Sequence, residues 1–317
     1  MFGFCFGWSR ADKPSGAEGI VYKMDYVVLS PLNHLGHFRR MKEIKAQWFL
    51  TWAAIAVMLL SLPACASTID TVSIYSGSMH KQSKAIVIYP NTTSDEPIPV
   101  LYLLHGLGGD YGSWLKIKPE LVDYADQHRL IIVCPDGGER SWYLDSPIDS
   151  SFRYETHLIQ EVVPYVDSLY NTVRSREGRA IAGLSMGGHG SLFLAMRHPE
   201  MFSIACSTSG SVDLLKRTFS WKYKEMVLGD TTCCLSNWQA NSVTRLAEQF
   251  PPDQLKLHID CGTEDEVIDV NRELHRKLLE RGIEHEYIER PGAHNAAYWA
   301  ESIDSIMSFV VMHFDLK

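Results

Sequence analysis

Apolar residues follow two different rhythms along residues 71–314 of this chain. Two runs, 71–76 and 84–90, alternate apolar and polar residues, which predicts an antiparallel pair of half-buried strands. Five later runs are apolar almost throughout, as expected of strands that are buried on both faces of a sheet. These runs cover residues 100–106, 130–138, 179–185, 203–210 and 255–262, and a further predicted strand at 284–292 closes the series.

Helical periodicity, with apolar residues three or four positions apart, fills the intervals between these strands. It is found in residues 154–170, 186–199, 270–279 and 298–314. In the first of these helices, one face collects Leu158, Val162, Tyr165, Val166 and Leu169. Strand and helix in repetition predict an α/β fold, with a mostly parallel sheet and helices on both faces.

Residues 213–252 interrupt this rhythm and are rich in aromatic and polar residues. We expect them to form a small cap-like insertion over the C-terminal edge of the sheet. Ligands bind at that edge in open α/β sheets. The insertion is therefore expected to lie over an active site.

The N-terminal extension, residues 1–66, has a pattern of its own. Residues 48–62 carry no charge, follow Lys42 and Lys45, and precede a small-residue stretch, which together predict a secretory signal. The run is shorter than the ~20 residues of a membrane span, although an N-terminal anchor is the alternative interpretation. We expect export to the periplasm or the medium, and a catalytic domain over residues 67–317.

The end of this leader has two interpretations. Ala64-Cys65-Ala66 fits a signal-cleavage site, whereas the preceding Leu-Pro-Ala-Cys stretch resembles a bacterial lipoprotein box. In the second case, a lipid anchor at Cys65 is the expected contact with a membrane. The sequence leaves both interpretations open.

Composition narrows the class of partner. Of the 317 residues, 45% are hydrophobic, and 38 acidic residues outnumber 30 basic ones for a net charge of −8. Nucleic acids are held chiefly by Lys and Arg, so an acidic chain is a poor candidate for binding them. None of the seven cysteines has metal-ligand spacing. Cys134 and Cys261 lie in apolar runs and are expected to be buried, whereas the adjacent Cys233 and Cys234 have no assigned role.

One serine lies among four glycines, between a predicted strand and a predicted helix. The stretch AIAGLSMGGHGS, residues 180–191, contains Gly183-Leu184-Ser185-Met186-Gly187, a G-x-S-x-G match. At a strand-to-helix corner such a serine has a strained backbone and projects its hydroxyl above the sheet. The chain approaches itself so closely there that only glycine fits two residues before and after. The motif in this setting predicts that Ser185 is a nucleophile.

A serine hydroxyl needs a base to take its proton and a third group to orient that base. In α/β-hydrolases the chain order is serine, acid, histidine. The predicted strand at 255–262 is followed by the stretch TEDEVID, in which we favour Asp265 as the acid. His294 lies on the loop directly after the last predicted strand and is the predicted base. The alternatives for the acid are Glu264, Glu266 and Asp269.

The oxyanion that develops during acyl transfer needs hydrogen-bond donors. The backbone N–H of Met186 lies at the start of a predicted helix, whose dipole favours negative charge. The loop HGLGG, residues 105–109, follows a predicted strand, and we expect the N–H of Leu107 to be the second donor. Neither glycine cluster has the spacing of a phosphate-binding loop.

Several stretches of the chain resemble the esterase D family of α/β-hydrolases. That family includes S-formylglutathione hydrolases, feruloyl and acetyl-xylan esterases, tributyrin esterases and mycolyltransferases. The resemblance covers nearly all of residues 70–314 and is carried by YLLHGLGGDYGSW, PDGGERSWYLDSP, IAGLSMGGHGSLFLAMRHPEMF, DCGTEDEVIDVNRELHRKL and PGAHNAAYW. It implies an α/β-hydrolase fold, and it implies the same catalytic and oxyanion-hole residues: Ser185, Asp265, His294, Leu107 and Met186.

The resemblance also implies positions near the acyl group of a substrate. Trp114, Trp142 and Tyr143 fall where members of the family approach the acyl pocket, with core packing as the alternative role. The expected function is that of a secreted serine carboxylesterase acting on short-chain or aryl esters, including acetyl or feruloyl esters of polysaccharide. An acyltransferase and an S-formylglutathione hydrolase-like thioesterase are the alternatives. This chemistry requires no metal or organic cofactor.

Overall fold

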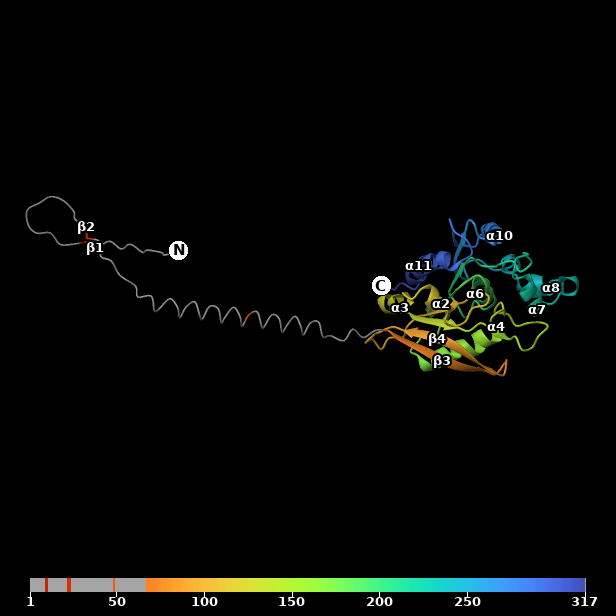
Figure 1. Cartoon of the computed structure of the whole chain (residues 1–317), viewed down its shortest axis with the longest axis horizontal. Helices are drawn as coiled ribbons and strands as arrows, with labels where there is room; N and C mark the ends of the chain where they lie inside the picture. Colours follow the sequence, from red (N-terminus) through yellow and green to blue (C-terminus); the bar gives the residue numbers. More distant parts are fainter. Residues whose placement is uncertain (1–8, 11–21, 24–47, 49–66, 317) are drawn as a thin grey trace, which may run out of the picture. The chain divides into compact units, whose positions relative to one another are not determined.

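The computed structural model describes residues 9–10, 22–23, 48 and 67–316, so Cys65 and all but these few residues of the leader discussed above lie outside the described residues. The chain divides into two units, Met1–Ala64 and Cys65–Lys317. In the first unit, β1 (Ser9–Arg10) pairs antiparallel with β2 (Tyr22–Lys23). In the second, an eight-stranded sheet carries helices on both faces (Figure 1).

The strand order across this sheet is β10-β9-β8-β7-β5-β6-β4-β3. The two antiparallel ladders join β3 to β4 and β4 to β6, and all other neighbours are parallel. This confirms the predicted antiparallel pair and the mostly parallel sheet. The strands are β3 (Thr68–Ser76), β4 (Lys81–Tyr89), β5 (Val100–Leu104), β6 (Ile131–Pro135), β7 (Arg179–Leu184), β8 (Ile204–Thr208), β9 (Lys256–Gly262) and β10 (Glu286–Arg290).

Each face of the sheet buries its own set of side chains. On β5, Leu101 and Leu103 pack in the cluster that holds α2 (Ser113–Ile117), α3 (Leu121–His128) and α11 (Ala296–His313). The alternate residues Tyr102 and Leu104 pack in a second cluster with α6 (Met186–Arg197) and α10 (Ile268–Glu280). This period of two explains the continuous apolar runs in the sequence, because both faces of the central strands are buried. The buried Cys134 and Cys261 confirm the prediction for these residues.

The helical stretch after β6 differs from its predicted form. It consists of α4 (Tyr154–Thr156), the π-helical turn η1 (His157–Val162) and α5 (Val163–Leu169). Leu158, Val162 and Val166 are buried as expected, but Leu169 is 56% exposed, so its predicted place on the inner face is wrong. Leu169 is the last residue of α5, and the next residue, Tyr170, is extended, so Leu169 lies where the chain leaves the helix.

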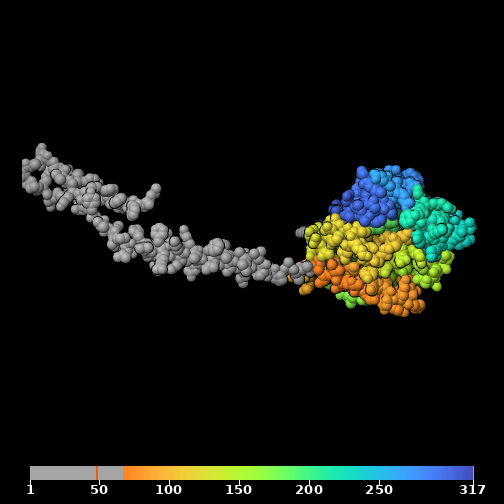
Figure 2. All heavy atoms as spheres, in the orientation of Figure 1, coloured from red at the N-terminus to blue at the C-terminus, as the bar shows by residue number. Residues whose placement is uncertain are grey.

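Residues 213–252 contain α7 (Trp221–Leu228), α8 (Thr231–Asn241) and α9 (Val243–Leu246), which form one flank of the surface in Figure 2. The rings of Trp221 and Trp238 stack 4.5 Å apart and join α7 to α8. At the end of α8, the carbonyl of Asn241 accepts a hydrogen bond of 2.8 Å from Nε2 of His189 on α6. Among the described residues, no helix is long and apolar enough to cross a bilayer.

Lys224 on α7 is a buried cation of this insertion. Its Nζ donates to the carbonyls of Leu214, at 3.1 Å, and Lys216, at 2.9 Å, and lies 5.3 Å from the centre of the Trp142 ring. Burial lowers the pKa of Lys224 to about 8, against weaker opposing effects of Asp213 and Glu266. Removing this charge from water therefore costs stability wherever the amine is protonated.

Replacing Lys224 by methionine is expected to change the pH dependence of stability. Because the pKa of Lys224 falls from 10.5 in the unfolded chain to about 8 in the folded one, the unfolded chain binds more protons between these values. The free energy of unfolding of the parent therefore rises across this window, whereas that of Lys224→Met lacks this contribution. Urea unfolding measures the free energy of unfolding of both proteins at pH 7 and pH 10. Between these two values, the parent should gain about 3 kcal/mol of stability relative to the variant. The exposed Lys222→Met is the control, and a variant that gains relative to the parent would contradict the prediction.

Candidate active site

Ser185 lies at a sharp turn between β7 and α6. Its backbone has φ 54° and ψ −112°, a conformation that is strained for a residue with a side chain. Neighbouring strands hold it in place: its N–H donates to the Thr208 carbonyl at 3.0 Å, and its own carbonyl accepts from the N–H groups of His189 and Ser211. Because the turn is fixed on both sides, the Ser185 hydroxyl is held at the C-terminal edge of the sheet.

The glycines on either side of Ser185 are required by close backbone contacts. A Cβ atom on Gly183 would lie 2.3 Å from the carbonyl oxygen of Gly187. A Cβ atom on Gly187 would lie 2.4 Å from the carbonyl oxygen of Leu104 and 2.6 Å from that of His105. These contacts confirm that only glycine fits at the two positions.

Gly187→Ala is expected to destabilise the protein by about 3 kcal/mol, because the added methyl group meets backbone that can only move together with β5. The shift would also displace the loop after β5, so kcat should fall with stability. Thermal unfolding and ester hydrolysis would measure both effects. Gly77→Ala is the matched control, since its Cβ would meet its nearest neighbour, Glu161 Oε1, at an ordinary 3.7 Å. Equal unfolding temperatures for the two variants would contradict the steric argument.

Three side chains from distant parts of the sequence meet at this turn. Nε2 of His294, on the loop after β10, lies 2.8 Å from Oγ of Ser185. Nδ1 of the same ring lies 2.9 Å and 3.0 Å from the two carboxylate oxygens of Asp265, on the loop after β9. A carboxylate only accepts, so the Nδ1–H of His294 donates to Asp265. Nε2 is then free to accept the proton of the Ser185 hydroxyl.

The carboxyl group of Asp265 is buried and ionised. Burial alone would raise its pKa, but the hydrogen bond and charge of His294, with the N–H of Val267 at 3.0 Å, hold the pKa below its usual value. The alternatives from the sequence lie elsewhere. Glu264 and Glu266 are exposed, and Asp269 pairs with Lys216. Of the four carboxylates, the structure therefore brings Asp265 to the histidine.

Two backbone amides beside Ser185 are available to a ligand. The N–H of Met186 is at the first residue of α6, where helix geometry provides no intrahelical acceptor. The loop that carries Leu107 passes close by, since a Cβ atom on Gly106 would lie 3.5 Å from that of Ser185. Within residues 67–316, neither the Leu107 nor the Met186 N–H donates a hydrogen bond. Both can therefore point at an oxyanion formed on Ser185.

His105 fixes the loop that carries Leu107. Its Nε2 accepts a hydrogen bond of 2.9 Å from the N–H of Gly137, so Nδ1 carries the proton and donates to the Gly106 carbonyl at 2.8 Å. The N–H of Gly108, the residue after Leu107, donates to the Glu139 carbonyl at 2.7 Å. The sequence showed His105 only as part of a glycine-rich loop, because its partners in the loop after β6 are distant in the chain.

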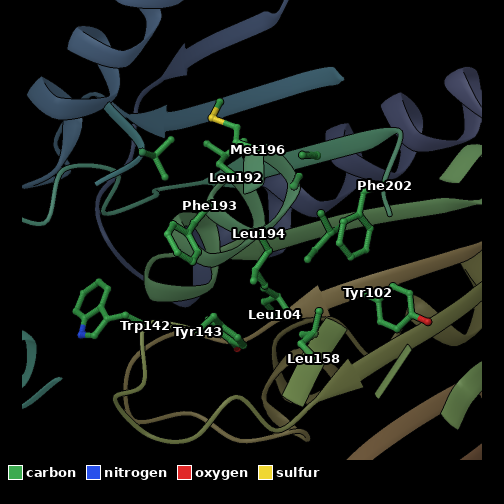
Figure 3. Packing of buried hydrophobic residues seen from close by; sticks show 14 of the residues in the cluster. Tyr102, Leu104, Trp142, Tyr143, Leu158, Leu192, Phe193, Leu194, Met196 and Phe202 are labelled. Carbon is green, nitrogen blue, oxygen red and sulfur yellow. The ribbon is translucent and has the colours of Figure 1, made fainter. Parts of the chain in front are cut away.

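The three predicted aromatic substrate residues are buried instead. Trp114 has no exposed surface and donates its Nε1–H to the Leu104 carbonyl at 2.8 Å. Tyr143 donates its hydroxyl to the His105 carbonyl at 3.1 Å, and the Trp142 N–H contacts Sδ of Met186 at 3.4 Å. Figure 3 shows Trp142 and Tyr143 packed with Phe193 in the core. All three side chains therefore have the core-packing role that was the alternative, and their contact with a substrate stays a prediction.

Trp299 contacts His294, and the sequence did not single out this tryptophan. Its ring lies edge-to-face with the His294 ring, with centroids 5.1 Å apart and an interplanar angle of 90°. It belongs to α11, five residues after His294, where the signal was only one aromatic residue among several in an apolar helix. Trp299 therefore limits the rotation of the imidazole.

A strained serine between a strand and a helix is hydrogen-bonded to a histidine, which in turn donates to an aspartate. On a mostly parallel sheet, this arrangement defines an α/β-hydrolase of the serine hydrolase class. The chain belongs to the family described as "Putative esterase", whose family model matches residues 76–310. As a member of this family it is a carboxylic ester hydrolase. Within residues 67–316, no group of three His, Cys, Asp or Glu side chains is placed to hold a metal ion.

Several known proteins are similar to this chain. An acetyl esterase of Caldicellulosiruptor saccharolyticus is 26% identical over 73% of this chain and 94% of its own length. A solved ferulic acid esterase is 25% identical, with a TM-score of 0.68 over 78% of this chain and 99% of its own. A diacylglycerol acyltransferase/mycolyltransferase Ag85B of Mycobacterium avium is 35% identical over 36% of this chain and 37% of its own. These similarities confirm the α/β-hydrolase fold and the esterase family.

Proposed function

We propose that this protein hydrolyses short-chain or aryl carboxylic esters through an acyl-enzyme on Ser185, with His294 as the base and Asp265 as the group that orients it. The observation that carries the proposal is the contact of 2.8 Å between Ser185 Oγ and His294 Nε2, at a strained turn that holds the hydroxyl at the C-terminal edge of the sheet. Such a contact allows the proton to leave as the carbon–oxygen bond forms.

The reaction follows in two steps. Ser185 Oγ attacks the ester carbonyl as Nε2 of His294 takes its proton, and the negative charge on the carbonyl oxygen is held by the N–H groups of Leu107 and Met186. When the carbonyl re-forms, the bond to the alkoxide breaks and the alkoxide takes the proton from His294. Water then attacks the acyl carbon, giving its proton to His294, and Ser185 leaves with that proton.

Acetyl and feruloyl groups on polysaccharide are the proposed acyl groups. The acetyl esterase and the ferulic acid esterase that resemble this chain support this choice, since the resemblance extends over most of both proteins. The segment shared with the Ag85B acyltransferase favours a second candidate, in which an alcohol replaces water in the second step. The machinery at Ser185 is the same in both cases, because only the nucleophile that enters last differs.

Purified full-length chain should release p-nitrophenol from the acetate and butyrate esters, ferulic acid from methyl ferulate, and acetate from acetylated xylan. S-formylglutathione is included to detect a thioesterase. Adding an alcohol such as glycerol distinguishes the second candidate, since a transferase forms a new ester while a hydrolase forms the free acid. A fluorophosphonate probe should label Ser185. Ester turnover at the uncatalysed rate, or a label on another serine, would contradict the proposal.

A further inference from the structure

Cys233 and Cys234 are the accessible thiols among residues 67–316. Cys233 is exposed and Cys234 is partly exposed, whereas Cys134, Cys206 and Cys261 are buried. Burial raises the pKa of Cys134 to about 12, and it raises the pKa of the other two buried thiols as well. Thiolates are the reactive form, so reagents that act on thiols should select the adjacent pair.

The two sulfur atoms touch although they belong to neighbouring residues of a helix. Sγ of Cys233 lies 2.9 Å from Sγ of Cys234. Neighbouring side chains of a regular α-helix point about 100° apart and do not face each other. Here α8 is interrupted at Cys234, whose φ −126° and ψ 26° lie outside the helical range. The break in the backbone is what brings the sulfurs together.

The surrounding turn holds this geometry. The Asp230 carbonyl accepts from the N–H of Cys233 at 3.2 Å, from the N–H of Cys234 at 2.8 Å and from Sγ of Cys233 at 3.3 Å. The Asp230 side chain caps the helix through the N–H of Thr232 at 2.7 Å. Gly229 has φ +86°, and a Cβ atom there would lie 2.8 Å from Sγ of Cys234. The space that this sulfur occupies therefore depends on glycine.

We propose that Cys233 and Cys234 form a redox-active dithiol that closes to a vicinal disulfide by exchange with a small-molecule disulfide. The thiolate of the exposed Cys233 attacks one sulfur of oxidised glutathione, forms a mixed disulfide and releases one glutathione thiolate. The thiolate of Cys234 then attacks Sγ of Cys233, forms the bond between the two residues and releases the second glutathione. Two cysteine thiols are oxidised, one glutathione disulfide is reduced, and the two protons end on the glutathione thiols.

The order of attack follows from the contacts. The hydrogen bond with Cys233 raises the pKa of Cys234, so Cys234 ionises less readily than in water. Once Cys233 carries glutathione, its sulfur is already beside the second thiol. The attack of Cys234 on Sγ of Cys233 should therefore be faster than the addition of a second glutathione to Cys234, because the reacting atoms are held within contact distance.

Mass spectrometry of the full-length protein tests this directly, because trypsin releases both residues in one peptide, 225–245, with no other cysteine. The protein is reduced, freed of reductant, incubated with oxidised glutathione and alkylated with iodoacetamide. The expected product is a 225–245 peptide lighter by two hydrogens, with no alkyl group and no glutathione. Dithiothreitol before alkylation should convert it to the doubly alkylated form.

Single variants supply the controls. Cys233→Ser and Cys234→Ser each leave one thiol, so their peptides should carry glutathione or one alkyl group, and the loss of two hydrogens should disappear. A parental peptide that keeps glutathione, stays doubly alkylated, or is cross-linked to a second chain would overturn the proposal. The readout does not depend on ester hydrolysis, so it can fail or succeed independently of the proposed function.

Discussion

Ser185→Ala should lower kcat for p-nitrophenyl acetate by at least roughly 10⁴-fold, because the acyl-enzyme can no longer form. Alanine keeps a Cβ atom, so the strained backbone at φ 54° should not relax, and the fold should be unchanged. Initial rates of p-nitrophenol release measure the effect, and thermal unfolding verifies the fold. The remaining rate would come from binding and from the amides of Leu107 and Met186.

The matched control for this variant is Ser168→Ala, an exposed serine on α5 that bonds only to the Tyr165 carbonyl. It should keep kcat within about twofold of the parent, as expected of a surface substitution away from the site. Ser185→Ala protein that unfolds at the parental temperature and still turns over ester at the parental rate would remove Ser185 from the mechanism.

Asp265→Asn is expected to reduce kcat by about 10⁴-fold with little change in KM. The asparagine amide can donate to Nδ1 of His294, which moves the ring proton to Nε2 and removes the acceptor that faces Ser185. The buried position makes the effect larger than a simple loss of charge, since water cannot replace the carboxylate. Steady-state kinetics on the acetate ester would measure both constants.

Asp269→Asn serves as the paired control, because this carboxylate belongs to the same stretch and bonds to Lys216 at the surface. Its kcat should change by less than about threefold, in line with the small value of exposed ion pairs. If Asp269→Asn were the damaging variant and Asp265→Asn were harmless, the orienting role would have to be reassigned. The same comparison with Glu264→Gln covers another alternative.

The sequence was most informative where local geometry restricts the residue type. Backbone contacts at the turn require Gly183 and Gly187, so the sharp turn around the serine could be predicted from one short stretch. The central strands were equally clear, because burial on both faces leaves almost no polar residues in them. By contrast, β3 and β4 begin before their predicted runs, since an antiparallel ladder at the sheet edge also pairs exposed polar residues.

Other features depend on contacts that the sequence does not contain. Four carboxylates follow β9 within seven residues, and only their burial and distance to His294 distinguish Asp265 from the others. Trp142 and Tyr143 were expected near the acyl group because of the family resemblance, with core packing as the alternative role. Both have left-handed backbone conformations, with φ 57° and 58°, and pack into the core. A turn of this kind gives no periodic signal.

The position of β10 in the sheet has a consequence for how this enzyme loses activity on heating. β10 has a neighbour on one side only, β9, and the loop at its end supports the imidazole, whereas the hydroxyl is attached to a strand with partners on both sides. An outer strand detaches at lower cost than an inner one. Thermal inactivation should therefore begin with local unfolding of β10, which displaces the loop that carries His294. This should occur at temperatures where most of the protein is still folded.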